Sequence, residues 1–422
     1  MLTKENCLLY VELLKIELVP AMGCTEPISI AYAAAMAKKI LGTMPKKAEL
    51  IVSANIVKNV KSVTVPHTGG MRGLKSAFAA GIIAGNPDVE LEVLAHATEE
   101  DIVKMIKLKE ELPTDISVPE DAHVFEVGVK LYNDEHCSYV RIVDKHTNIV
   151  HMSLDDNIIF EKETENKRKK IDRSILNVSD IIEFANSVDI SLVKETLDRQ
   201  IEYNMAIAKE GLTNNYGANV GKTFMNSYHN DVKTLAKAYS AAASDARMNG
   251  CEKPVIINSG SGNQGITASV PVIVYADYYK IDKEKLYRAL CVSNLITIHL
   301  KTGIGTLSAY CGVISAGAGA ACGIAYLLGG SEKEIIHTLV NDLAIDSGII
   351  CDGAKASCAA KIAMSVESGI FGYELYKNGN QFYGGDGIVK RGVENTIKNV
   401  SRLAKYGMRE TDKEIIKIMI EE

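Results

Sequence analysis

The chain of 422 residues contains no tryptophan, and only 6% of its residues are aromatic. It also lacks a strong excess of either charge, because 47 Lys and Arg stand against 53 Asp and Glu. The resulting net charge of -6 gives no electrostatic footprint for nucleic acid or for an anionic membrane surface, so we expect neither partner. The length predicts about two or three domains, with ample apolar residues for a hydrophobic core.

The sequence shows no clear targeting or membrane-spanning segment. The first residues, MLTKENCLLYVELLKIE, mix acidic and apolar residues and lack the basic start of a signal peptide, so we expect an amphipathic helix. Residues 302–330 carry no charge, and their length alone would permit a membrane span. This run consists largely of weakly apolar Gly, Ala and Ser, without basic residues at its far end. We therefore expect a buried, tightly packed helix there, and a cytoplasmic protein.

The cysteines do not form the patterns typical of a disulfide scaffold or a zinc site. An odd number of cysteines without a secretion signal argues against a disulfide framework. No Cys-x-x-Cys pair occurs, so a local redox motif and a typical zinc site are both missing. A Gly-x-Ser-x-Gly elbow for a serine nucleophile is absent as well. The cysteines are therefore interpreted either as reduced thiols or as metal ligands. The nine cysteines stand at positions 7, 24, 137, 251, 291, 311, 322, 351 and 358.

The N-terminal part of the chain mixes helical and strand patterns. Residues 28–41 are rich in alanine and predict a helix. Residues 48–56, 88–97 and 139–154 contain β-branched residues and apolar–polar alternation, which predict strands. The polar, mixed-charge run at 161–173 follows and predicts a solvated loop between two domains.

From about residue 175 onward, apolar residues recur at helical spacing. Several of these segments end in glycine, as helix C-termini do, and their small residues allow close packing. We therefore predict an α+β protein, with an α/β domain at 1–165 and a compact all-helical domain at 175–422. The segments with helical spacing are 178–188, 192–211, 235–250, 283–300 and 332–345.

The stretch Cys351-Asp-Gly-Ala-Lys-Ala-Ser-Cys358 places two thiols around a small, flexible turn, and Cys311 lies upstream of them. Three thiolates from separated helix ends suit an iron–sulfur cluster with one iron left free to act as a Lewis acid. Cysteine is equally a common small buried residue, so spacing alone leaves both interpretations open. The second interpretation applies fully to Cys7, Cys137, Cys291 and Cys322.

A second candidate is the stretch just before the helix predicted at 28–41, where Gly23 and Pro27 bracket Cys24, Thr25 and Glu26. Proline suits the first turn of a helix. A helix N-terminus lowers the pKa of a thiol and binds anions, which makes Cys24 a candidate base or nucleophile. An ordinary helix start with a buried cysteine is the alternative, and the residues alone do not decide between the two.

Residues 258–266, Asn-Ser-Gly-Ser-Gly-Asn-Gln-Gly-Ile, concentrate glycines and uncharged polar side chains. Backbone N–H groups and amides of this kind hold small anions, so we favour a carboxylate site over a flexible surface loop. The stretch lacks the Gly-Lys-Ser/Thr ending of a P-loop. His146 and His151 lie five residues apart on a predicted strand, which points them to opposite faces and argues against one shared metal. For these and for His67, a hydrogen-bonded structural histidine is the simpler interpretation.

Six motifs occur together in this chain: GCTEP, HTNIVH, ASDARMNG, NSGSGNQGIT, LSAYCG and GIICDGAKASC. In this order they closely resemble the L-cysteine desulfidase family, which is related to the iron–sulfur L-serine dehydratases. The resemblance runs from about residue 8 to the end of the chain. It implies a carbon–sulfur lyase that converts L-cysteine to pyruvate, ammonia and hydrogen sulfide by β-elimination, without pyridoxal phosphate.

The resemblance also implies roles for individual residues. A [4Fe–4S] cluster would be held by three cysteines, and its remaining iron would bind the substrate. By motif, the cluster ligands are Cys311, Cys351 and Cys358. The candidate proton acceptors are Cys24, the mobile catalytic thiol, and Glu26 and His67. The implied substrate-binding residues are Thr25, Asn258, Ser259, Gly260, Ser261, Gly262, Asn263 and Gln264.

Two features separate this chain from the serine dehydratase pattern. Those enzymes carry Ser-Ser-Ser-His-Thr where this chain has Gly-Cys-Thr-Glu, and their last two ligand cysteines stand further apart than Cys351 and Cys358. Both differences favour sulfur chemistry over elimination of a hydroxyl group. A serine dehydratase-like carbon–oxygen lyase and an amino-acid-binding sensor without turnover are the alternatives. We expect the active site between the two domains of a homodimer.

Overall fold

The computed structural model describes residues 2–22, 25–119, 122–123, 125–162, 171–305 and 308–421. Its mixture of a sheet and many helices confirms the predicted α+β class.

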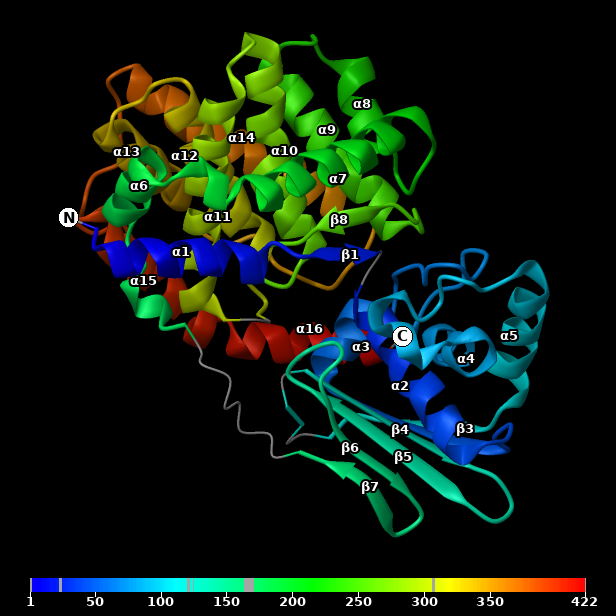
Figure 1. Ribbon diagram of the computed structural model, residues 1–422. Coiled ribbons are helices and arrows are strands. Elements are labelled where there is room, and N and C mark those ends of the chain that lie inside the picture. The colour runs from blue at the N-terminus through cyan, green and yellow to red at the C-terminus, as the bar shows by residue number, and fades with distance from the viewer. Residues whose placement is uncertain are drawn as a thin grey trace.

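Figure 1 shows the helical bundle beside a smaller part that contains the sheet. The helices are α1 (Lys4–Glu17), α2 (Thr25–Leu41), α3 (Ala54–Val60), α4 (Leu74–Ala84), α5 (Glu99–Glu111), α6 (Val178–Ser187), α7 (Lys194–Thr213), α8 (Val220–Ser227), α9 (Val232–Met248), α10 (Gly262–Tyr279), α11 (Lys283–Ile304), α12 (Gly312–Leu327), α13 (Glu332–Ile345), α14 (Cys358–Lys377), α15 (Val393–Arg402) and α16 (Arg409–Glu421). The strands are β1 (Pro20–Met22), β2 (Lys47–Val52), β3 (Thr114–Ser117), β4 (Glu126–Tyr132), β5 (Cys137–Val143), β6 (Ile149–Leu154), β7 (Asn157–Glu161) and β8 (Pro254–Ile256).

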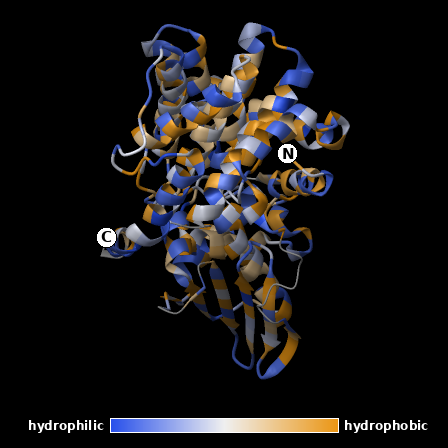
Figure 2. Cartoon of the chain, turned by 90° about the vertical axis from the view of Figure 1, so that its left-hand side faces the viewer, coloured by the Kyte–Doolittle hydropathy of each residue, from blue (hydrophilic) through white to orange (hydrophobic). Residues whose placement is uncertain are grey.

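The larger sheet has the order β3-β2-β4-β5-β6-β7 and is antiparallel except for the parallel β2–β3 pair. Hydrophobic and hydrophilic residues alternate along its strands (Figure 2), which gives the sheet one face for packing. The alanine-rich helix α2 packs against β4 and β5 and, on its other side, against α4. Gly81 of α4 permits this second contact, because a Cβ there would lie 2.2 Å from the carbonyl oxygen of Ala31. Small residues thus bring α2 and its first turn close to the centre of the molecule.

The helical bundle is built around α12, which packs against α10, α11, α13 and α14. Glycines allow these approaches: a Cβ at Gly319 would meet the Thr297 hydroxyl at 2.3 Å, and one at Gly317 would meet the Ser365 hydroxyl at 2.1 Å. The uncharged run predicted to form a buried helix therefore forms one from Gly312 onward. Among the described residues, no helix combines the length and hydrophobicity needed to cross a bilayer.

Both ends of the chain cross between the two parts of the fold (Figure 1). Tyr10 and Leu14 of α1 belong to the hydrophobic core of the helical bundle. Strand β1 continues this packing by pairing with β8, with Pro20 opposite Ile256. At the other end, α16 leaves the bundle and packs against α3. The division at 1–165 and 175–422 stays a prediction, and residues 163–170 of the proposed boundary lie outside the described residues.

Three predicted strands need correction. Residues 88–97 form a 3-10 helix and turns, because Pro87 favours a helical start and Glu90 has a positive φ of 47°. Residues 139–154 form a hairpin of β5 and β6, whose chain reversal includes Asp144 with φ 66°. His146 therefore lies in the turn, and His146 and His151 do not share one strand. The strand predicted at 48–56 ends at Val52, and Ser53 is the N-cap of α3.

Candidate active site

Backbone pairing brings two of the three predicted ligand cysteines together. The N–H of Cys311 donates to the Ile349 carbonyl at 3.0 Å, and the N–H of Cys351 donates to the Ala309 carbonyl at 2.7 Å. Between them, Tyr310 and Ile350 form an isolated antiparallel bridge. Two loops far apart in the sequence are thus fixed edge to edge, with a cysteine at the end of each.

The third cysteine, Cys358, is the first residue of α14, and Cys311 is the N-cap of α12. The exposed N–H groups of a helix start carry partial positive charge, which stabilises a thiolate. Cys358 packs beside Val63 and Met248, which connects it to the sheet part and to the end of α9. The site therefore lies where elements from both parts of the fold meet.

The surroundings of the thiols favour negative charge at Cys351. Contact with the Cys311 thiol, assisted by Lys58 and Lys301, holds the pKa of Cys351 well below its usual range. The same contact, together with burial, raises the pKa of Cys311. Burial also raises the pKa of Cys358. One thiol of the group is therefore disposed to ionise first, while its neighbour keeps its proton.

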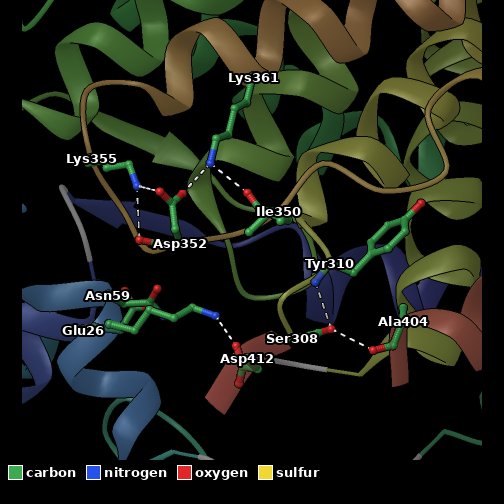
Figure 3. A network of polar contacts seen from close by, with 11 residues as sticks. Glu26, Asn59, Ser308, Tyr310, Ile350, Asp352, Lys355, Lys361, Ala404 and Asp412 are labelled. Atoms are coloured by element: carbon green, nitrogen blue, oxygen red, sulfur yellow. Dashed lines mark hydrogen bonds and ion pairs between the residues drawn. The ribbon is translucent and has the colours of Figure 1, made fainter. Parts of the chain in front are cut away.

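Buried and half-buried lysines surround the thiol loops. Lys58 is 1% exposed, and its Nζ lies 2.5 Å from a carboxylate oxygen of Asp412 in α16. Burial lowers the pKa of Lys301 to about 8. Lys355 and Lys361 both point to Asp352, the residue that follows Cys351 (Figure 3). Four cationic side chains thus stand around two acidic ones, which favours an anionic group at the thiols.

The three thiols have the donor chemistry of an iron–sulfur cluster site. Within the described ranges, no group of three or more His, Cys, Asp or Glu side chains has the spacing that one ion needs. A [4Fe–4S] cluster binds each thiolate through a different iron, so its ligands stand further apart. The donor set of three cysteines, held in a cationic environment, has the chemistry of a cluster site.

The stretch 258–266 is largely buried and consists of a turn followed by the first residues of a helix. Asn258 and Ser261 close a tight turn, and α10 begins at Gly262. Gly260, Gly262 and Gly265 have the Gly-x-Gly-x-x-Gly spacing, which starts in the turn after β8 and continues into the first turn of α10. However, the preceding strand β8 pairs antiparallel with β1, so this is not a parallel dinucleotide-binding unit. The start of a long helix remains a favourable place for a small anion.

The polar side chains of this stretch point to different places. The Asn258 amide donates to Asn294 Oδ1 at 2.9 Å and is fully buried, so this side chain is occupied within the bundle. Gln264 instead lies against Gly312, the neighbour of Cys311, where a Cβ would meet its side chain at 2.7 Å. The Oε1 atom of Gln264 is buried without a hydrogen-bond partner among the described residues. Of the predicted substrate-binding residues, Gln264 therefore reaches the neighbour of Cys311 with its side chain.

Arg247 at the end of α9 is a site residue that the sequence interpretation missed. It is only 5% exposed, and its Nη1 donates to Asn263 Oδ1 at 3.2 Å. Its Nε is buried without a hydrogen-bond partner in the part of the chain that the structure describes. The residue belongs to the ASDARMNG motif, but one arginine in an amphipathic helix is normally a surface residue, so its type gave no signal.

Of the predicted proton acceptors, Glu26 and His67 lie in different surroundings, while Cys24 is outside the described residues. Glu26 lies in the first turn of α2, where its carboxylate is 3.3 Å from the Thr25 hydroxyl. The amide of Asn59 donates to it at 3.4 Å. The Nδ1 atom of His67 instead lies 2.9 Å from a carboxylate oxygen of Glu252.

His146 is a second residue whose place the sequence did not indicate. Its carbonyl accepts from the Ser29 hydroxyl at 2.7 Å, and its ring meets the Phe125 ring edge-on at 4.8 Å. Its Nε2 is buried and has no hydrogen-bond partner within the described chain. Burial lowers the pKa of His146, Glu26 opposes this change and Arg247 adds to it. The HTNIVH turn, the GCTEP helix and α9 thus converge on one region.

Residues 88–417 match the family model described as serine dehydratase alpha chain. The chain belongs to this family. A UPF0597 protein of Desulfitobacterium hafniense is 56% identical, over 97% of this chain and 96% of the relative. UPF0597 proteins of Lachnoclostridium phytofermentans and Treponema denticola are 49% and 47% identical, over 97% and 98% of this chain and 99% and 98% of theirs. Membership in the serine dehydratase alpha-chain family suggests a lyase with a small amino-acid substrate, and this family typically uses an iron–sulfur cluster.

Proposed function

We propose that this member of the serine dehydratase alpha-chain family is an L-cysteine desulfidase. It would convert L-cysteine to pyruvate, ammonia and hydrogen sulfide without pyridoxal phosphate. The observation that supports this proposal most directly is the gathering of Cys311, Cys351 and Cys358 beside the starts of α12 and α14. A family member with three thiols, cationic neighbours and a nearby anion-binding helix start has the parts that such a lyase needs.

In this proposal, Cys311, Cys351 and Cys358 hold a [4Fe–4S] cluster. When bound, the cluster supplies a free iron that acts as a Lewis acid and stabilises a leaving sulfide. The chain contributes the charge balance, because Lys58 and Lys301 stand near the thiolates.

The chain's own residues would position the substrate and move its proton. Asn263, Gln264 and the N–H groups at the start of α10 would hold the carboxylate, near Thr25 at the start of α2. Ser259, Gly260, Ser261 and Gly262 would shape the turn, and Asn258 would brace it through Asn294.

The reaction itself is a β-elimination. A base takes the Cα proton, the freed electron pair forms the Cα=Cβ bond, and the Cβ–S bond breaks with release of sulfide. The aminoacrylate then tautomerises, and water hydrolyses the imine to pyruvate and ammonia. The proposed base is Cys24, with Glu26 and His67 as the alternatives. Cys24 directly precedes α2, where a helix start favours a thiolate.

The decisive experiment is anaerobic reconstitution of the full chain with iron and sulfide, followed by addition of L-cysteine. We expect thiolate-to-iron absorption bands and equal amounts of sulfide and pyruvate. Cys311→Ala, Cys351→Ala and Cys358→Ala should each weaken the bands and abolish turnover. Cys291→Ala is the matched control, because Cys291 is a fully buried cysteine of α11 that has no role in the proposed site. Normal bands and turnover in all three variants would refute the proposal.

The family match favours one second candidate, a serine dehydratase-like carbon–oxygen lyase. Pyruvate from L-serine, without sulfide from L-cysteine, would establish it. A third outcome, stabilisation by amino acids without any turnover, would indicate a sensor. The homodimer, the cytoplasmic location and the two-domain division also stay predictions; light scattering of the purified chain tests the first.

A further inference from the structure

Arg247 carries a buried positive charge that has no acidic partner among the described residues. In the ranges that the structure describes, no Asp or Glu forms an ion pair with it, and its Nη1 reaches only the neutral Asn263 and the Met248 sulfur. The nearest acid in its helix, Asp245, accepts instead from the Gly221 N–H at 2.9 Å. An unpaired charge in the interior is costly, so such a group normally has an anion to bind.

The backbone next to Arg247 leaves room for its guanidinium. A Cβ at Gly262 would lie 2.2 Å from the Arg247 Nε, so only glycine leaves the space that the guanidinium occupies. Gly262 is also the first residue of α10, whose free N–H groups add positive potential at the same point. Arginine fork and helix start together match the two oxygens of a carboxylate.

This anion position lies next to the thiols. The Asn263 amide lies 3.6 Å from the Met248 sulfur, and Met248 packs in one cluster with Cys358. Gln264 extends from the same helix turn to Gly312, beside Cys311. Met248 therefore lies between the guanidinium and Cys358, and the first turn of α10 lies between it and Cys311. This arrangement suits an amino acid that has its carboxylate at one end and its sulfur at the other.

We propose that Arg247, held by Asn263 and Gly262, binds the α-carboxylate of the substrate and makes the site selective for free amino acids. This inference rests on the proposed function and adds a residue that determines specificity. Neutral derivatives with the same side chain, such as amides, would leave the guanidinium without a counter-charge.

Two matched ligand pairs test this proposal. L-cysteine and L-cysteinamide differ only in the carboxylate and report on turnover, while L-alanine and L-alaninamide report on binding without turnover. In the wild type, we expect a lower KM for L-cysteine than for its amide, and a higher Tm with L-alanine than with its amide. Arg247→Met should lower kcat/KM for L-cysteine by roughly 30-fold or more, through KM, and remove both preferences.

Three further variants separate binding from folding. Arg247→Lys keeps the charge and should restore part of the preference for carboxylates. Gly262→Ala keeps the arginine but displaces it, so the preference should again be lost. Arg199→Met is the control, because Arg199 of α7 also has a buried Nε without a partner among the described residues, yet has no role in the proposed site. Circular dichroism of each variant checks that it folds.

The outcomes distinguish this inference from the proposed function. If the protein releases no sulfide but L-alanine raises the Tm of the wild type and not of Arg247→Met, the carboxylate site stands and the desulfidase function falls. If sulfide is released and Arg247→Met retains its KM and its preference for L-alanine, the function stands and the inference is overturned. A wild type that does not distinguish L-alanine from L-alaninamide also overturns it.

Discussion

At the scale of single residues, the three thiols differ in their readiness to ionise. The Cys311 thiol, Lys58 and Lys301 all favour the thiolate of Cys351. Burial disfavours the thiolate of Cys358, and Cys311 keeps its proton against Cys351. The first iron to arrive would therefore meet one preformed thiolate, and the other two thiols would lose their protons on binding.

This difference predicts the order of alkylation in the metal-free protein. Cys351 should react with iodoacetamide as a thiolate at a pH well below the ordinary midpoint of about 8.5. Removal of one cation by Lys58→Met should raise that midpoint by about one pH unit. Peptide mass spectrometry over a pH series measures both values.

Cys137 is the internal reference for this titration. It is partly exposed, and burial raises its pKa, so its alkylation should begin at higher pH and be unchanged in Lys58→Met. Equal midpoints for Cys351 and Cys137 would contradict the electrostatic account of the thiol group.

The sequence could indicate which thiols belong together only through the order of motifs. Cys311 and Cys351 meet because two loops pair at Tyr310 and Ile350, a contact that neither spacing nor periodicity encodes. Arg247 was missed for a related reason. Its burial arises from α10 packing over the end of α9, and a single arginine in a helix has the same local pattern whether exposed or buried.

At the scale of elements, α16 connects the two parts of the fold beside the thiols. Asp412 pairs with the buried Lys58, and the Lys61 ammonium donates to the carbonyl of Met419. The carbonyl of Lys58 in turn lies so close to Gly353 that a Cβ there would be 2.0 Å away. Helix α16, helix α3 and the loop of Cys351 thus form one stack.

We predict that Asp412→Asn lowers the free energy of unfolding by about 3 kcal/mol, because it leaves the Lys58 charge buried without its partner. Urea unfolding followed by circular dichroism measures this loss. Glu410→Gln in the same helix is the matched control, since Glu410 pairs with Lys413 on the exposed surface and its replacement should change stability little. Equal losses in the two variants would show that the buried Lys58–Asp412 pair contributes no more to the free energy of unfolding than an exposed pair.

Helices were predicted more accurately than strands, and the reason is local. The helix at 332–345 was predicted with its bounds because its apolar residues recur at helical spacing, and in the structure Ser331 and Glu334 form a capping box at its start. The strand predicted at 139–154 is interrupted by a turn. The prediction missed this turn because the alternation of apolar and polar residues continues on both sides of Asp144. Strand β1 pairs with β8, which lies roughly 230 positions later in the sequence. Only tertiary packing determines such a contact.

At the scale of the whole molecule, two buried carboxyl groups and one half-buried carboxyl group of the described residues make stability depend on pH. Burial raises the pKa of Asp245 and of Asp346 to about 6. Burial, with Asp346 nearby, raises the pKa of Asp342 well above its usual range. Each of these groups binds a proton in the folded chain at a pH where the unfolded chain has released it. Their contribution to stability is therefore complete below about pH 4 and is lost as the pH rises through about 6 and beyond.

Asp346→Asn removes one of these contributions and reduces a second, because the Asp346 carboxylate helps to raise the pKa of Asp342. Asparagine does not titrate, so the variant should gain stability relative to the wild type between pH 5 and pH 7. The gain should be on the order of 1 kcal/mol, after allowance for the partial exposure of Asp346. Urea unfolding of both proteins at each pH measures the difference.

The comparison between the two proteins matters more than either curve alone. Burial lowers the pKa of His146 and of His337, and these groups make the folded chain more stable as the pH rises through the same window. Their effect is common to both proteins and cancels in the difference. Glu410→Gln should run parallel to the wild type, because Lys413 lowers the pKa of Glu410 and keeps it ionised throughout. If Asp346→Asn also runs parallel to the wild type, Asp346 is ionised in the folded chain at pH 5, and a cation or water must satisfy it.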